Sequence, residues 1–135
     1  MILCGTHNSI ILSNDSSEAR YLCEILEGLL SIEEVNDQIS DMGEEIGMTL
    51  GRLDVLFKAW LLALNSERLT VEIGNDSPLY LEDRLEARAY SAPEVLEMIL
   101  EEQWHIEWLE EEILKVTQAK DWAKRVQNGE LRLLF

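Results

Sequence analysis

The chain has 135 residues, with 27 acidic and 11 basic side chains, a formal charge of −16 and a pI near 4.3. This charge excludes the basic footprint that direct binding of DNA or RNA needs, and it disfavours docking on an anionic membrane. Hydrophobic residues make up 47% of the chain, which predicts a single folded domain over residues 1–135, and two cysteines without a Cys-x-x-Cys pair indicate a cytoplasmic protein.

The first thirty residues predict a β hairpin followed by a helix. Residues 1–4 and 9–12 are apolar or β-branched, and the residues between them, Gly5-Thr6-His7-Asn8, are typical of turns. Several N-cap residues at 13–17 predict a helix from Glu18 to Leu30. Its expected apolar face consists of Tyr21, Leu22, Ile25, Leu26 and Leu29.

A long amphipathic helix is the clearest pattern in the chain. Ser31 and Glu34 form a capping box, which predicts a new helix start. Apolar residues then recur every three or four positions for about eight turns, so one helix should extend to about Asn65. This stripe consists of Val35, Ile39, Met42, Ile46, Leu50, Leu53, Phe57, Trp60 and Leu64.

Length and glycine content both bear on how this helix packs. A helix of about 35 residues is near 50 Å long, so its stripe predicts a homodimer or larger assembly. Gly43, Gly47 and Gly51 follow each other at intervals of four. They either let another backbone approach closely or mark a weakened, kinked or split helix.

The middle of the chain predicts a second hairpin. Residues 69–73 alternate like a strand, residues 74–78 form a turn cluster, and residues 79–82 could return as the second strand. Such a hairpin could pair with the N-terminal one. A short helix over residues 80–90 is the alternative, since Leu81, Leu85 and Ala89 share a helical phase.

The last long helix should run from Ala92 into the 120s. Ser91 and Glu94 form a second capping box, and Asn128-Gly129 marks the end. The expected fold is therefore mainly α: a helical bundle-like single domain with long amphipathic helices and one or two short β hairpins. The stripe of this last helix consists of Val95, Ile99, Glu102, Ile106, Leu109, Ile113 and Val116.

Glu102 stands in that stripe where an apolar residue belongs. His105 follows three residues later, so both side chains project from one helical face. A buried carboxylate is costly unless it is paired or metal-bound. Glu-x-x-His on a bundle helix is also the spacing of carboxylate-bridged di-metal sites. The pair is therefore either a hydrogen-bonded structural pair or part of a metal site.

The segment Glu102-Gln-Trp-His-Ile-Glu-Trp-Leu-Glu110 resembles the last bundle helix of bacterioferritins and related ferritin-like proteins, and the likeness covers residues 91–127. The resemblance implies that Glu102 and His105 are ligands of iron, manganese or zinc. The family also uses a second Glu-x-x-His, which this chain lacks because its other histidine lies in the predicted hairpin turn. Further carboxylates could come from Glu24, Glu27 and Glu45.

The acidity of the last helix suggests a binding surface. Residues 91–113 carry eight glutamates and no basic residue, and the sequence contains no phosphate-binding loop or nucleophile elbow. We therefore expect a small, non-catalytic, cofactor-free protein that self-associates and binds a basic protein partner. Imitation of the charge of nucleic acid is one way in which it could bind such a partner. The alternative is a ferritin-like metal-binding protein. The expected partner-binding residues are Glu97, Glu101, Trp104, Glu107, Trp108 and Glu111.

Overall fold

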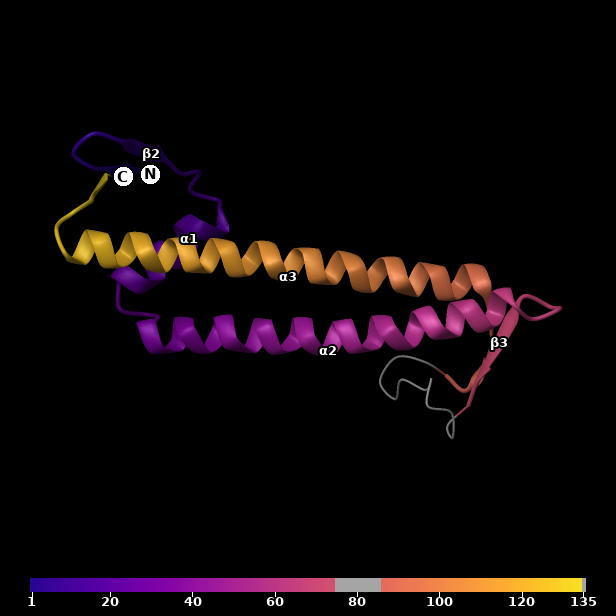
Figure 1. Cartoon of the computed structure of the whole chain (residues 1–135). Coiled ribbons are helices and arrows are strands. Elements are labelled where there is room, and N and C mark those ends of the chain that lie inside the picture. The colour runs from indigo at the N-terminus through magenta and orange to yellow at the C-terminus, as the bar shows by residue number, and fades with distance from the viewer. Residues whose placement is uncertain (75–85, 135) are drawn as a thin grey trace. The chain divides into compact units, whose positions relative to one another are not determined.

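A computed structural model describes residues 1–74 and 86–134, and over these residues the protein is mainly α-helical, as expected (Figure 1). The chain divides into two compact units: unit 1, Met1–Glu44 with Leu109–Phe135, and unit 2, Glu45–Trp108. In chain order the elements are β1 (Ile2–Cys4), β2 (Ser9–Ile11), α1 (Ser17–Leu26), α2 (Ile32–Leu64), β3 (Thr70–Ile73), β4 (Arg88–Ser91), α3 (Ala92–Gln127) and β5 (Arg132–Leu134).

The predicted N-terminal hairpin is confirmed. Strands β1 and β2 pair antiparallel, and the Gly5 amide donates to the Asn8 carbonyl at 2.7 Å to close the turn. The apolar C-terminal tail supplies a third strand, because β5 pairs antiparallel with β1. Sheet order is β2-β1-β5.

Helix α1 begins as expected but ends four residues earlier than predicted. The Ser16 hydroxyl caps its start by accepting from the Ala19 amide at 3.1 Å. Its end is set by Gly28, whose φ of +78° lies in the left-handed region that glycine adopts readily. The chain turns there, so Leu29 is 72% exposed instead of joining the apolar face, and Leu30 is buried in its place.

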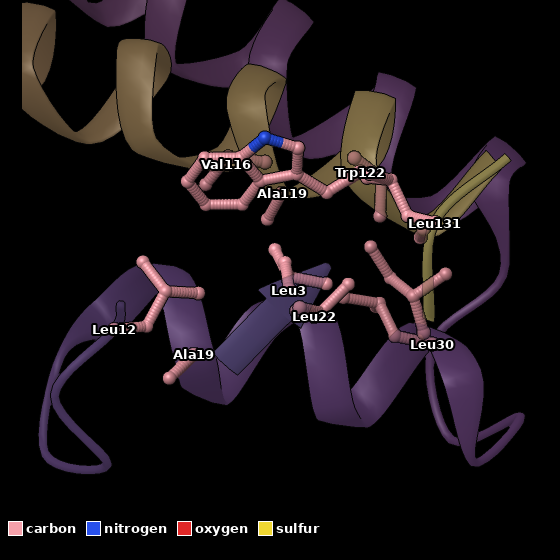
Figure 2. Packing of buried hydrophobic residues seen from close by; sticks show 12 residues of the cluster. Leu3, Leu12, Ala19, Leu22, Leu30, Val116, Ala119, Trp122 and Leu131 are labelled. Carbon is pink, nitrogen blue, oxygen red and sulfur yellow. The ribbon is translucent and has the colours of Figure 1, made fainter. Parts of the chain in front are cut away.

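The core of unit 1 gathers side chains from α1, the sheet and the last turns of α3 (Figure 2). Leu3 of β1 lies between Leu22 of α1 and Trp122 of α3. Polar contacts reinforce this packing, since the Tyr21 hydroxyl donates to the buried Glu112 carboxylate at 3.4 Å. The sheet and the C-terminal end of α3 thus share one hydrophobic cluster.

Helix α2 is unbroken through its three glycines. Its capping box is confirmed, since the Ser31 hydroxyl accepts from the Glu34 amide at 3.1 Å and donates to the Glu34 carboxylate at 3.2 Å. A Cβ atom at Gly43, Gly47 or Gly51 would meet no heavy atom of the described chain within 4 Å. The described chain therefore neither splits this helix at the glycines nor brings another backbone against them.

The described part of one chain covers only some of the predicted stripe in the second half of α2. Leu50, Phe57 and Leu64 of the stripe are 53%, 41% and 42% exposed. The residue just before each of them is buried instead. The buried residues of this half are Thr49, Leu53, Leu56, Ala59 and Ala63.

Unit 2 contains a second, separate two-stranded sheet. Strand β3 pairs antiparallel with β4, so the return strand is Arg88–Ser91, and the predicted return strand at 79–82 lies outside the described residues. The alternative helix over 80–90 is wrong at its described end, where the chain is extended. The two hairpins do not combine, because they belong to different sheets.

Helix α3 begins at the predicted capping box. The Glu94 amide donates to the Ser91 hydroxyl at 3.3 Å, and the Glu94 carboxylate accepts from the Ser91 amide at 3.2 Å. Arg88 of β4 donates to the same carboxylate at 2.7 Å. Together these contacts lower the pKa of Glu94 below its usual value, and the hydrogen bond from Arg88 has the largest effect. They join β4 to the start of α3.

The predicted stripe of α3 is confirmed along the helix. Val95, Ile99, Ile106 and Val116 are all buried, and Ile113 is half-buried. In unit 2 the stripe packs with the buried side of α2 and with residues of β3 and β4. This is the scaffold that positions Glu102 and the residues around it.

Two glycine substitutions should change stability in opposite directions. Gly28→Ala forces a side chain into a positive φ, which should cost about 1–2 kcal/mol of unfolding free energy. Gly51→Ala lies in a helix interior with open space around it, and should add about 0.5–1 kcal/mol. Urea unfolding followed by circular dichroism measures both. Equal signs for the two variants would contradict the assigned end of α1.

Candidate functional site

The part of α3 in unit 2 presents two chemically different sides. The inner side carries the buried carboxylate of Glu102, and the outer side carries exposed tryptophans among glutamates. Both sides arise from one helical segment, because residues three or four apart share a face while residues two apart point in very different directions.

Glu102 is 4% exposed, which confirms that at least one member of the Glu102–His105 pair is buried. The His105 side chain is 30% exposed, and its Nε2 lies 2.8 Å from Oε1 of Glu45 on α2. This carboxylate was one of the three that the sequence proposed near His105. The other two, Glu24 and Glu27, belong to unit 1.

A further side chain of the site was missed from the sequence. Thr49 is fully buried on α2, one turn after Glu45, and its hydroxyl donates to the Glu45 carbonyl at 2.8 Å. That bond satisfies the hydroxyl within its own helix. A threonine next to Leu50 does not stand out in a hydrophobic pattern, so only the structure identifies it.

His105 is held on two sides. Besides its contact with Glu45, its ring lies nearly parallel to that of Trp108, with an interplanar angle of 9° and ring centroids 6.3 Å apart. A hydrogen bond on one side and an aromatic ring on the other restrict the imidazole rotamer. His105 therefore connects the inner side of α3 with Trp108 on the outer side.

Chemically, the inner side is a polar pair within a hydrophobic layer. Over residues 1–74 and 86–134, no group of three or more His, Cys, Asp or Glu side chains is arranged as a metal site. One imidazole and two carboxylates nonetheless supply nitrogen and oxygen donors of the types that zinc, iron and manganese use. Any complete coordination shell needs ligands beyond those that the described part of one chain brings together.

The outer side is an exposed surface, which we call the acidic tryptophan face. It consists of Glu97, Glu101, Trp104, Glu107 and Trp108. The two tryptophans lie one turn apart and are 63% and 56% exposed. Among the described residues, the ion pairs involve none of its three glutamates. Glu111, the remaining predicted partner-binding residue, is exposed and belongs to unit 1.

Unit 1 contains a cavity of about 420 Å³ lined by the hairpin turn, including His7, and by the end of α3. Its two oppositely charged lining residues, Arg125 and Glu130, form an ion pair at 3.4 Å. Their charges offset each other, so the cavity gives no electrostatic preference for a charged ligand.

Comparison with protein-family models, with curated proteins and with solved structures finds no match. None of the described helices is long and apolar enough to cross a membrane.

The acidic tryptophan face should distinguish cations from anions in solution. Cs⁺ and I⁻ both quench tryptophan on collision, and the field of the glutamates should concentrate Cs⁺ and repel I⁻. We expect the ratio of Cs⁺ to I⁻ quenching constants to fall in the triple variant Glu97→Gln, Glu101→Gln, Glu107→Gln. The matched control, Asp37→Asn, Asp41→Asn, Glu44→Gln, removes three exposed charges in unit 1 and should leave the ratio near its original value.

Proposed function

We propose that this protein is a non-catalytic interaction protein whose acidic tryptophan face binds a basic protein partner. The observation that carries the proposal is the pair of exposed tryptophans, Trp104 and Trp108, on a helical segment with only acidic charges. Tryptophan is among the residues that dominate the binding energy of protein interfaces. Two of them exposed side by side are expensive to hydrate, and a partner that covers them recovers that cost.

The composition of the face favours arginine and lysine as the contacting residues. A guanidinium or ammonium group over an indole ring gains about 0.5–2 kcal/mol. Neighbouring carboxylates add charge-assisted hydrogen bonds, which arginine can make with two parallel donors. The glutamates of the face have no basic neighbour among the described ion pairs. They are therefore available to an incoming cation.

The charge pattern also relates to proteins that bind nucleic acid. Carboxylates four residues apart on a helix, such as those of Glu97 and Glu101, are separated by a rise of about 6 Å. Phosphates along a nucleic-acid strand likewise present negative charge at regular short intervals. A basic surface that binds phosphates can in principle bind this face. The proposal extends to such proteins as partners, with the face imitating the charge of nucleic acid.

A nona-arginine peptide is a direct probe of the face. The peptide should change the fluorescence of Trp104 and Trp108 on binding, and the affinity should fall steeply with salt because exposed charges are screened. Replacing both tryptophans by alanine should weaken binding by about 10- to 30-fold, as lost cation–π contacts predict. Titration by calorimetry measures the affinity of this variant.

The charge-neutralised variants separate a local site from overall acidity. Glu97→Gln, Glu101→Gln, Glu107→Gln should weaken peptide binding more than Asp37→Asn, Asp41→Asn, Glu44→Gln, although both remove three charges. Equal weakening by the two triple variants would mean that the peptide responds only to net charge. That result would contradict the proposed face.

A ferritin-like metal site is the second candidate function. The resemblance of residues 91–127 supports it, and so does the approach of Glu45 to within 2.8 Å of His105 Nε2. Glu45, Glu102 and His105 would supply some of the ligands of such a metal, and the rest would have to come from outside the described part of one chain. In ferritin-like proteins, imidazole and carboxylate groups bind iron, manganese or zinc.

Metal titration decides between the two candidates. Because the described part of one chain does not bring together a three-ligand site, Zn²⁺, Mn²⁺ and anaerobic Fe²⁺ should leave the Tm of the protein unchanged. Differential scanning calorimetry is the measurement, and His105→Gln is the matched variant. A metal-dependent rise in Tm that disappears in His105→Gln would favour the ferritin-like function.

A further inference from the structure

We propose that a second face of unit 2 is the interface between two copies of this chain, with α2 of one copy packed against α3 of its partner. We call it the apolar face. It shares no residue with the acidic tryptophan face, although Glu107 of that face lies two turns after Leu100 on the same line of α3. The two proposals rest on different side chains and have separate tests. Its residues, all between 40% and 53% exposed, are Leu50, Phe57, Leu61, Leu64, Leu96 and Leu100.

Four of these residues recur on one side of α2, with the exposed Asp54 between Leu50 and Phe57. Leu50, Phe57, Leu61 and Leu64 are spaced by seven, four and three residues, which keeps them on one side of a helix with 3.6 residues per turn. The buried residues of the same helix half lie about a quarter of a turn away. Helix α2 therefore has two apolar stripes in unit 2, and the described part of its own chain covers only one.

Helix α3 places its exposed leucines on the same side of the helix pair. Leu96 and Leu100 each follow a buried residue, as Leu50 follows the buried Thr49. Within unit 2 the two helices run antiparallel (Figure 1). The residue that follows a buried residue is rotated by about 100° around the helix axis. In two antiparallel right-handed helices, this rotation points to the same side of the pair. The leucines of both helices therefore form one surface.

The size of the apolar face suits an interface. Six side chains that are about half exposed leave several hundred Å² of apolar surface, the size of the largest patch on a typical single chain, which is often functional. Two such faces and their polar rims approach the roughly 1,200 Å² of the smaller stable interfaces. A two-helix layer paired with its own copy gives a four-helix bundle, in which each helix contacts two neighbours.

Charge selects the orientation in which two copies pack. The part of α2 in unit 2, residues 45–64, carries Glu45, Arg52, Asp54 and Lys58 and is neutral overall, and Asp54 and Lys58 pair with each other at 2.9 Å. Residues 92–108 of α3 carry five glutamates and neither lysine nor arginine. Twofold packing of α3 on α3 would oppose two acidic segments. Packing α2 on the partner's α3 instead sets the neutral segment against the acidic one, and it satisfies both copies at once.

Two neighbouring leucines provide a matched test. Leu61 belongs to the apolar face, and Leu62 points about 100° away from it, yet their exposed fractions are 53% and 54%. Sedimentation velocity at micromolar concentration should give a dimer of the 15.5-kDa chain for the parent protein and for Leu62→Glu. Leu61→Glu should weaken association by about 100-fold or more, because it places a charge in the interface. A monomeric parent protein, or equal effects of the two variants, would overturn the proposal.

Crosslinking tests the orientation with milder substitutions and also decides if Leu61→Glu fails to fold. In a Cys4→Ala, Cys23→Ala background, Phe57→Cys and Leu96→Cys chains are mixed and treated with a short bismaleimide. A mixed crosslinked dimer is expected, since Phe57 of α2 faces α3 of the partner. Crosslinking of Leu96→Cys chains alone, without the mixed product, would show α3 packed on α3 and overturn the orientation. No dimeric product in any mixture would overturn the interface.

Discussion

A pair of packed helices can bury only one side of each helix, and the properties of unit 2 follow from this constraint. The buried sides of α2 and α3 meet in one cluster with β3 and β4. Most other apolar side chains of the two helix segments are exposed in the described part of the chain. Eleven of the sixteen large hydrophobic residues that are exposed in the described structure belong to unit 2. Exposed apolar surface in unit 2 is thus a consequence of its architecture.

The same constraint explains which predictions from the sequence succeeded. In helix α3 the positions that recur every three or four residues are also the buried ones, so the burial of Val95, Ile99 and Glu102 could be predicted. Both capping boxes, at Ser31 and Ser91, were also predictable, because capping depends on residues only three positions apart. Local patterns therefore defined the helices and the buried carboxylate.

Helix α2 was harder because two stripes compete in its second half. A hydrophobicity pattern selects Leu50 over Thr49 and Leu64 over Ala63, yet the structure buries the smaller residue of each pair. Small side chains let two helix axes approach, which is a property of the partner helix and not of the local sequence. The pairing of β5 with β1 was unpredictable for a similar reason, since it joins the two ends of the chain. The polar contact of His105 with Glu45 likewise spans 60 residues.

The two proposed surfaces lie on the same helix, so their electrostatics are linked. Association brings together two chains of charge −16, a repulsion that salt screens. Binding of a basic partner to the acidic tryptophan face gains from the same negative charge, so salt weakens it. The two equilibria should therefore respond to salt in opposite directions. A basic partner also lowers the charge of each copy, and by reciprocity any resulting gain in self-association must equally strengthen partner binding. The acidity that keeps single chains apart is thus the property through which a basic partner could bring them together.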